Sequence, residues 1–328
     1  MIKPVVLVTS PQLSDTGKQV LRDAGAEVSY MSEISEDILA TRLASGGINA
    51  VLMRGSPPFT RRVLESAQDL KIIAKHGAGI DSVDLDTATA RGIVVMNAGD
   101  ANADPVVEVT IGMMLALARD LPRLDRNLKS GTWEKPRYLG REFRGRVVGI
   151  VGYGQIGRRV AKLAAALGAK VVIYTRSRPA DTGGAEIEDN LDRLLARVDV
   201  LSLHCGLNDK TRGMIGAREL GLMKPDAIFI NTARGPVVDE AALVDALKNG
   251  RLAGAGLDVF AKEPTDPKNP LFALDNVIVA PHVAAMTHEA LARMGTIAAT
   301  HIIDWLQRGV CDRANLINPA VLERVRAS

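Results

Sequence analysis

The sequence contains few of the residues that would indicate a disulfide scaffold, a metal site or a membrane protein. Its two cysteines, Cys205 and Cys311, lie far apart and form no CxxC pair. This spacing favours a reducing cytoplasm and indicates neither a disulfide framework nor a zinc site. The most apolar stretch, Val106–Ala118, is interrupted by Glu108 and Thr110. It therefore does not predict a membrane span, and the first apolar run is too short for a signal peptide.

Aromatic residues and excess charge are also scarce. Aromatics make up 3% of the chain and the net charge is only +3. No basic run carries interleaved aromatics, so neither nucleic acid nor a membrane surface is an expected partner. Hydrophobic residues reach 47%, which is ample for a core built mainly from Val, Ile, Leu and Ala. A length of 328 residues exceeds the usual size of one core, so two domains are expected.

Over the first hundred residues, short Val- and Ile-rich runs alternate with amphipathic helical patterns. The predicted strands are Val5–Thr9, Glu27–Met31, Val51–Arg54, Lys71–Lys75 and Ile93–Asn97. The predicted helices between them are Leu13–Ala24, Glu36–Ala44 and Thr60–Ser66. Apolar strands separated by helices predict a parallel sheet that is covered on both faces.

A second alternating series follows a long helix, Asp104–Ala118, and a polar arm, Arg119–Arg144. Its predicted strands are Val147–Val151, Lys170–Tyr174, Val200–His204, Ala227–Asn231, Gly254–Val259 and Val277–Ala280. Its clearest helices are Ile156–Leu167 and Glu240–Asn249, and a helix at Glu289–Arg308 precedes a short tail. We therefore predict an α/β fold of two doubly wound parallel-sheet domains. A Rossmann cofactor domain, residues 99–288, is inserted into a flavodoxin-like substrate domain, residues 1–98 and 289–328.

The run GYGQIG at Gly152–Gly157 follows a predicted strand and opens a predicted helix, which is the context that a dinucleotide-binding GxGxxG motif requires. Gly152 permits a tight turn, Gly154 lets the backbone approach a pyrophosphate, and Gly157 lets the helix pack on the strand. The amides of Gln155 and Ile156 at the helix start would donate to the phosphates.

The next strand ends without the acidic residue that binds the ribose hydroxyls of NAD, since the first carboxylate is Asp181. The residues predicted to meet a 2′-phosphate instead are Thr175, Arg176, Ser177 and Arg178. Guanidinium groups bind phosphate through forked hydrogen bonds, so we expect NADP(H) as the preferred cofactor. NAD(H) stays open, because the two arginines could also be solvated loop charges.

Four polar residues lie at or just after the ends of three predicted strands. Arg234 follows the strand that ends at Asn231, and His282 follows the last strand. Asp258 lies at the end of the strand Gly254–Val259, and Glu263 follows that strand. Ligands of open α/β sheets bind at this edge. Arg234 can hold the carboxylate of a 2-keto acid. His282 can donate the proton that the reduced carbonyl oxygen needs, while Glu263 favours the imidazolium form.

Five stretches of the chain together resemble the D-isomer-specific 2-hydroxyacid dehydrogenase family. They are His76–Asp81, Gly152–Gly157, Asn231–Gly235, Asp258–Pro264 and Pro281–His282. The resemblance implies that Arg234 anchors the substrate, that Glu263 modulates His282, and that His282 is the acid or base. It implies further that backbone amides near Ala78 and Gly79 bind the substrate carboxylate. The residues implied to line the cofactor are Cys205, Ala233, Asp258, Val106 and Thr110. The family's dimer surface implies a homodimer formed through the long helix and the arm.

Three functions stay open within this resemblance. The stretch Tyr174–Pro179 is most similar to that of NADPH-dependent glyoxylate/hydroxypyruvate reductases. Arg54 and Lys75, however, stand where phosphoglycerate dehydrogenases carry cations that meet the substrate phosphate. A phosphoglycerate dehydrogenase-like core that uses NAD and has no regulatory domain is therefore the main alternative. A nucleotide-sensing, corepressor-like binding protein is a third, which the intact Arg234, Glu263 and His282 disfavour.

Overall fold

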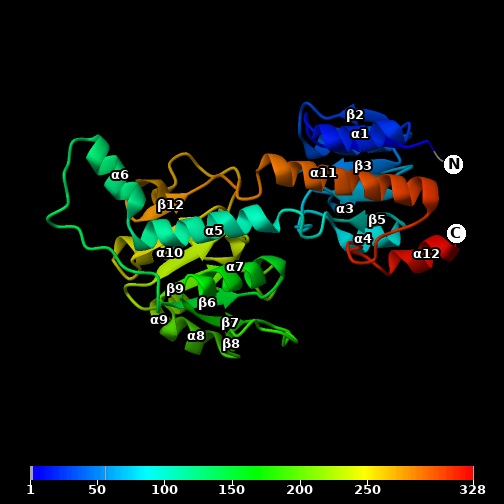
Figure 1. Cartoon of the computed structure of the whole chain (residues 1–328). Coiled ribbons are helices and arrows are strands. Elements are labelled where there is room, and N and C mark those ends of the chain that lie inside the picture. Colours follow the sequence, from blue (N-terminus) through cyan, green and yellow to red (C-terminus); the bar gives the residue numbers. More distant parts are fainter. Residues whose placement is uncertain (1–2, 56, 328) are drawn as a thin grey trace. The chain divides into compact units, whose positions relative to one another are not determined.

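The computed structural model describes residues 3–55 and 57–327, which divide into two compact units (Figure 1). Unit 1 comprises the described residues of Met1–Asn102 and Met286–Ser328, and unit 2 comprises Ala103–Ala285. The chain thus leaves unit 1 and returns to it. The joints lie at 102–103 and 285–286, whereas the sequence analysis places them at 98–99 and 288–289.

Unit 1 is built on a parallel sheet with strand order β2-β1-β3-β4-β5. The strands are β1 (Val5–Val8), β2 (Glu27–Tyr30), β3 (Ala50–Met53), β4 (Ile72–Lys75) and β5 (Val94–Met96). Side chains alternate between two apolar cores, because Val51 and Met53 belong to one cluster and Ala50 and Leu52 to the other. Helices therefore cover both faces of the sheet, as the near-continuous apolar strands predict.

The first of these faces is covered by α2 (Glu36–Ala44), α3 (Arg61–Ser66) and α4 (Leu85–Ala90). The second is covered by α1 (Asp15–Asp23), α11 (His288–Ile303) and α12 (Val321–Ala327). Side-chain caps set where several of these helices begin. The oxygens of Ser14, Ser35, Thr60, Asp84 and Thr287 each accept a hydrogen bond from an amide of the first turn.

Unit 2 is built on a parallel sheet with strand order β12-β11-β10-β9-β6-β7-β8. The strands are β6 (Val147–Val151), β7 (Lys170–Tyr174), β8 (Glu186–Ile187), β9 (Val200–Leu203), β10 (Ile228–Asn231), β11 (Gly254–Leu257) and β12 (Val277–Val279). The strand order reverses beside β6, and this switch point is where open α/β sheets bind ligands.

Two sets of helices cover the sheet of unit 2. One face is covered by α5 (Ala103–Ala118) and α7 (Gln155–Ala166). The other is covered by α8 (Leu191–Arg197), α9 (Ala217–Leu222) and α10 (Glu240–Lys248). Both sheets are parallel with interleaved helices, which confirms the predicted fold class.

Several short elements differ from the sequence analysis, which also does not name the helices α4, α8 and α9. The arm contains a helix, α6 (Leu121–Lys129), which buries no residue and whose Arg126 pairs with Asp275 at 2.6 Å. Strand β8 and helix α12 are also absent from the sequence analysis, and α11 passes into a π-helical turn, Asp304–Arg308, instead of continuing as α-helix. A two-residue strand carries little periodic signal. The arm, by contrast, has Leu121, Leu124 and Leu128 at helical spacing and Pro122 in the first turn, a signal that the sequence analysis does not use.

Candidate active site

The polar residues that follow β10, β11 and β12 lie at one edge of the unit 2 sheet. These three strands are adjacent and parallel, so their carboxyl ends meet there. Arg234 follows β10, Asp258 and Glu263 follow β11, and His282 follows β12. The topology thus places on one edge the side chains that the sequence analysis assigns to catalysis.

His282 and Glu263 form a hydrogen-bonded ion pair. The distance from Nδ1 of His282 to Oε2 of Glu263 is 2.7 Å. The other oxygen of Glu263, Oε1, accepts the N–H of Phe260 at 3.0 Å, which holds the carboxylate in place. With Nδ1 donating to Glu263, Nε2 of His282 has no hydrogen-bond partner within the described residues. This nitrogen is available to exchange a proton with a ligand.

The pKa values of the pair shift in opposite directions. The hydrogen bond to Glu263 raises the pKa of His282; burial and the charge of Arg234 oppose this, while the charge of Asp258 supports it. Burial raises the pKa of Glu263, but the bonds from His282 and Phe260 outweigh burial, so that the net shift is downward. The site therefore favours an ionised carboxylate beside a protonatable imidazole, as proton transfer near neutral pH requires.

Asp258 shapes the backbone around His282. Its side chain is 1% exposed, and its two oxygens accept the amides of Val283 and Ala284 at 2.8 and 2.9 Å. The amide of His282 donates to the carbonyl of Asp258 at 2.7 Å. These bonds hold His282 at φ +56°, a conformation that non-glycine residues rarely adopt. Burial raises the pKa of Asp258, and the two backbone hydrogen bonds oppose that shift.

Asn231 and Gly235 shape the turn that presents Arg234. The side chain of Asn231 accepts the amide of Ala233 and donates to the carbonyl of Arg234, both at 3.0 Å. At Gly235 an added Cβ would lie 1.8 Å from the carbonyl oxygen of Phe260. The Arg234 turn therefore packs directly on the backbone that binds Glu263. The sequence analysis does not assign a role to Asn231, although an amide side chain at a strand end before a turn is a usable signal.

The glycine motif forms a tight loop with open space above it. At Gly152, φ is +94° and a Cβ would lie 2.7 Å from the backbone of His204 and Cys205. At Gly157, a Cβ would lie 2.1 Å from the carbonyl oxygen of Gly152. Gly154, by contrast, has nothing within 4 Å and caps α7 without a side chain. Open space beside the first-turn amides of Gln155 and Ile156 fits the pyrophosphate of a nicotinamide dinucleotide.

The loop after β7 presents unpaired cations. Arg176, Ser177 and Arg178 are exposed and Thr175 is half-buried. Over residues 3–55 and 57–327, neither guanidinium forms a hydrogen bond or an ion pair, so both are free to meet a phosphate. Further along the loop, Tyr153 donates from Oη to the carbonyl of Thr182 at 2.7 Å and ties it to the glycine motif. No sequence signal beyond its place inside the motif marks Tyr153 for this role.

The remaining predicted cofactor contacts are at least half-buried in unit 2. Thr110 is fully buried; its hydroxyl donates to the carbonyl of Val106 at 2.7 Å and lies 2.8 Å from the hydroxyl of Thr232. Cys205 and Ala233 are half-buried near the carboxyl ends of β9 and β10. Burial raises the pKa of the Cys205 thiol, which does not suit a nucleophile.

The predicted substrate loop lies in unit 1, after β4. Ala78 and Gly79 are half-buried, and Asn97 donates from Nδ2 to the carbonyl of Ala78 at 2.9 Å. Arg54 and Lys75 lie at neighbouring strand ends, because Met53 pairs with Lys75.

His76, the next residue after Lys75, is a buried histidine with an unusual environment. Its Nε2 has no partner within the described chain. Burial and the charge of Arg54 lower the pKa of His76 to about 4, so this imidazole is neutral at physiological pH. A neutral, buried ring does not compete with His282 for the acid role.

No group of three or more His, Cys, Asp or Glu side chains in residues 3–55 and 57–327 could hold a metal ion. Over the same residues, every helix is too short or too polar to cross a membrane.

Known proteins similar to this chain were found by sequence and by structure. A family model described as "D-isomer specific 2-hydroxyacid dehydrogenase, NAD binding domain" matches residues 111–284. The chain is 41% identical to D-3-phosphoglycerate dehydrogenase of Methanocaldococcus jannaschii over 301 residues, which cover 90% of this chain and 56% of that protein. The chain thus spans little more than half the length of that relative.

A second relative matches over most of both chains. Glyoxylate reductase of Thermococcus litoralis is 40% identical over 285 residues, covering 84% of this chain and 85% of that protein. Among solved structures, the NADPH-dependent glyoxylate/hydroxypyruvate reductase of Sinorhizobium meliloti, in complex with NADP and malonate, superposes with a TM-score of 0.87. It is 29% identical and the alignment covers 97% of this chain and 98% of that one.

Proposed function

Since the chain belongs to the D-isomer-specific 2-hydroxyacid dehydrogenase family, we propose that it transfers a hydride between NADP(H) and a small 2-keto or 2-hydroxy acid such as glyoxylate or hydroxypyruvate. The observation that carries the proposal is the pair His282–Glu263, at 2.7 Å, on the sheet edge that also presents Arg234. A proton donor, its supporting carboxylate and a carboxylate-binding cation are the groups that this reaction requires of the protein.

The proposed roles follow from the contacts of each side chain. The nicotinamide, when bound, supplies the hydride. Arg234 binds the substrate carboxylate and orients the carbonyl, and the Ala78 and Gly79 amides are proposed as further carboxylate ligands. His282 gives its Nε2 proton to the carbonyl oxygen as the hydroxyl forms, while Glu263 stabilises the charged imidazolium. In the direction of oxidation, His282 takes the proton back.

The preference for NADP(H) rests on the loop after β7. Arg176 and Arg178 carry two exposed guanidinium groups that are unpaired within the described chain. No carboxylate lies between the end of β7 and Asp181. A 2′-phosphate would satisfy both charges, whereas the ribose hydroxyls of NAD would satisfy neither. The similarity to a reductase solved with NADP supports the same preference.

A histidine substitution tests the catalytic proposal. His282→Ala should lower kcat with NADPH and glyoxylate by roughly 10²- to 10⁴-fold, the usual contribution of a general acid, while leaving cofactor affinity near that of the parent. His288→Ala is the matched control, since His288 is exposed in the first turn of α11 and should leave kcat unchanged. Parental turnover in His282→Ala would remove His282 from the acid role.

A phosphoglycerate dehydrogenase-like function is the second candidate. Arg54 and Lys75 lie at adjacent strand ends in unit 1, and the 41% identity to an archaeal phosphoglycerate dehydrogenase supports a phosphate-binding role for them. Under this alternative, Arg54→Ala should raise KM for phosphohydroxypyruvate much more than KM for hydroxypyruvate. Equal KM changes for the two acids would favour the first proposal.

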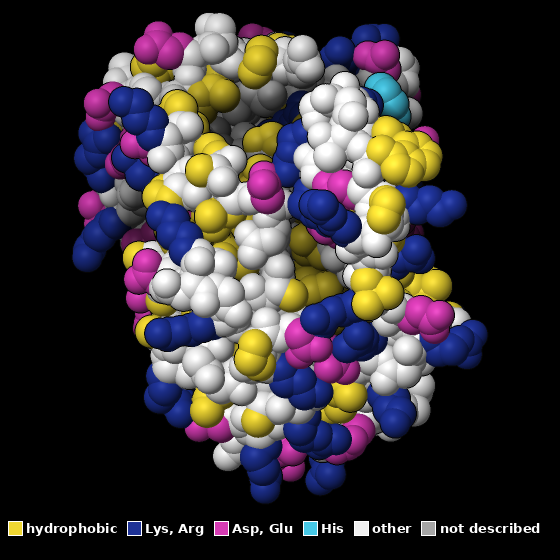
Figure 2. Space-filling view, turned by 90° about the vertical axis from the view of Figure 1, so that its left-hand side faces the viewer, with side chains coloured by type: hydrophobic (Ala, Val, Ile, Leu, Met, Phe, Trp, Pro, Cys, Tyr) yellow, Lys and Arg dark blue, Asp and Glu magenta, His cyan; other side chains and the backbone are white. Residues whose placement is uncertain are grey.

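We also propose a homodimer that is formed through α5 and the arm. Apolar side chains in the arm are exposed, and Trp133 and Leu139 are 70% and 94% accessible. Figure 2 shows hydrophobic side chains at the surface of one face among many lysines and arginines. Aromatic side chains such as that of Trp133 are enriched at protein interfaces. A mass in solution near that of one 35.0 kDa chain would contradict the dimer.

A further inference from the structure

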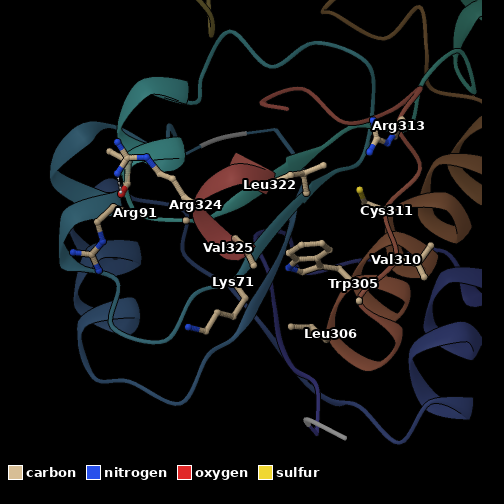
Figure 3. A pocket seen from close by; sticks show the side chains of 13 residues that line it. Lys71, Arg91, Trp305, Leu306, Val310, Cys311, Arg313, Leu322, Arg324 and Val325 are labelled. Carbon is tan, nitrogen blue, oxygen red and sulfur yellow. Dashed lines mark hydrogen bonds between the residues drawn. The ribbon is translucent and has the colours of Figure 1, made fainter. Parts of the chain in front are cut away.

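Unit 1 carries a groove of about 890 Å³ that the proposed reaction does not use. It is lined by residues from the end of α4, the π-helical turn after α11, the segment that follows, and α12 (Figure 3). Two of its residues, Lys71 and Gly92, lie at the amino ends of β4 and β5. Since the sheet is parallel, the groove is on the edge opposite to the one that carries Lys75, Ala78 and Gly79.

The groove is strongly cationic. Its charged lining residues are Lys71, Arg91, Arg313 and Arg324, and none of the described residues that line it carries a carboxylate. None of the four forms an ion pair within the described part of the chain. Arg91 donates to the carbonyls of Glu65, at 3.1 Å, and Ala67, and Arg324 donates to the carbonyl of Ala90 at 3.3 Å.

These backbone contacts hold Arg91 and Arg324 in place without neutralising them. A guanidinium has five N–H donors, so each keeps donors for a ligand. In the view of Figure 3, Arg91 and Arg324 lie on one side of the groove and Arg313 on the other. Unneutralised cations gathered around a concave surface raise the local positive potential and attract a multiply charged anion.

An aromatic side chain lies between these charges. Trp305, on the π-helical turn Asp304–Arg308, is half-buried, and its indole N–H has no hydrogen-bond partner over residues 3–55 and 57–327. The apolar side chains of Leu306, Leu322 and Val325 line the groove with it. An indole face stacks on planar rings, and π-helical turns inside helices are frequent at functional sites.

We propose that this groove binds a small aromatic polyanion of the nucleoside phosphate class. A bare inorganic anion would leave the indole and the apolar lining unused, and an apolar ligand would leave the cations unpaired. A planar ring on Trp305 with phosphates against the arginines uses both. The volume suits a ligand of this size. The inference does not depend on the proposed hydride transfer, because its residues lie on the other edge of the unit 1 sheet.

Tryptophan fluorescence tests the groove directly. The chain has two tryptophans, so Trp133→Phe leaves Trp305 as the only reporter. Trp305 lines the groove in unit 1, whereas the glycine motif lies in unit 2. ADP should therefore quench this fluorescence in a saturable manner without NADP⁺, which is itself a nucleoside phosphate and would compete for the groove. Adenosine and pyrophosphate, the ring and the charge alone, should each bind at least about tenfold more weakly.

Variants locate the binding. In the Trp133→Phe background, Arg313→Ala and Arg324→Ala should each raise the dissociation constant of ADP by roughly tenfold. Arg22→Ala, an exposed cation on α1, should not change it. A Tm near that of the parent shows that each variant is folded. Absence of reductase turnover in the parent would count against the proposed function, not against the groove. Absence of saturable quenching, equal affinity for pyrophosphate and ADP, or unchanged affinity in both arginine variants would overturn the inference.

Discussion

Two glycines of the same loop should respond in opposite ways to alanine, and the contrast tests how the motif works. At Gly157 the added Cβ meets the carbonyl oxygen of Gly152 at 2.1 Å. Both partners are backbone, so neither can rotate away, and α7 must shift by about an ångström. At Gly154 the same Cβ meets nothing within 4 Å, and φ is −80°, which any residue can adopt.

The expected magnitudes differ accordingly. Overpacking of this kind costs about 3 kcal/mol, and the better helix propensity of alanine returns at most about 1 kcal/mol, so Gly157→Ala should lose about 2 kcal/mol of stability. For a unit the size of 103–285 that corresponds to a Tm lower by roughly 4–8 °C. Gly154→Ala, which replaces a helix-capping glycine, should cost less than about 1 kcal/mol.

Gly157→Ala should be the less stable of the two variants, whereas Gly154→Ala should bind the cofactor more weakly. If the pyrophosphate packs on Gly154, the methyl group added in Gly154→Ala should weaken NADPH binding by at least about tenfold, while the Tm of the chain stays nearly parental. Thermal unfolding without cofactor and a fluorescence titration with NADPH measure the two effects separately. A Gly154→Ala chain with parental affinity, or a Gly157→Ala chain with parental Tm, would refute the reasoning.

Three further predictions concern charged side chains of the proposed site. Glu263→Gln removes the main cause of the raised pKa of His282, so the basic limb of the pH profile for keto acid reduction, where His282 loses its proton, should move to lower pH. For a half-exposed charged hydrogen bond of about 1 kcal/mol, kcat near neutral pH should fall about fivefold. Arg234→Ala should raise KM for the keto acid and lower kcat together, and a change in neither would exclude it as the anchor. Arg176→Ala with Arg178→Ala should raise KM for NADPH by roughly tenfold and leave KM for NADH unchanged. An unchanged KM for both cofactors would mean that these arginines are solvated loop charges.

The regular part of the fold could be predicted because its signals are local. Strands such as β6 and β7 are short Val- and Ile-rich runs, and the glycine motif at Gly152–Gly157 begins where β6 ends, at Val151. Helix α6 carries a local signal too, since Leu121, Leu124 and Leu128 stand at helical spacing. Its place against the rest of unit 2 could not be predicted, because contacts such as that of Arg126 with Asp275 join segments 149 residues apart.

The site shows the same division. That Arg234, Glu263 and His282 follow strand ends can be read from the chain order, and a parallel sheet brings such ends together. The contacts that orient them cannot be read in this way. The left-handed conformation of His282 depends on Asp258, and the close approach at Gly235 depends on the backbone of Phe260. Such contacts arise from packing between segments and leave no pattern in either segment alone.

The central claim is tested most directly by steady-state oxidation of NADPH and NADH, in parallel, with glyoxylate, hydroxypyruvate, pyruvate and phosphohydroxypyruvate. We expect fast turnover of NADPH with the small unphosphorylated acids and slower turnover with NADH. A preference for NADH together with phosphohydroxypyruvate would contradict the substrate and cofactor proposals and favour phosphate binding by Arg54 and Lys75. No turnover with any pair would contradict the proposed hydride transfer itself.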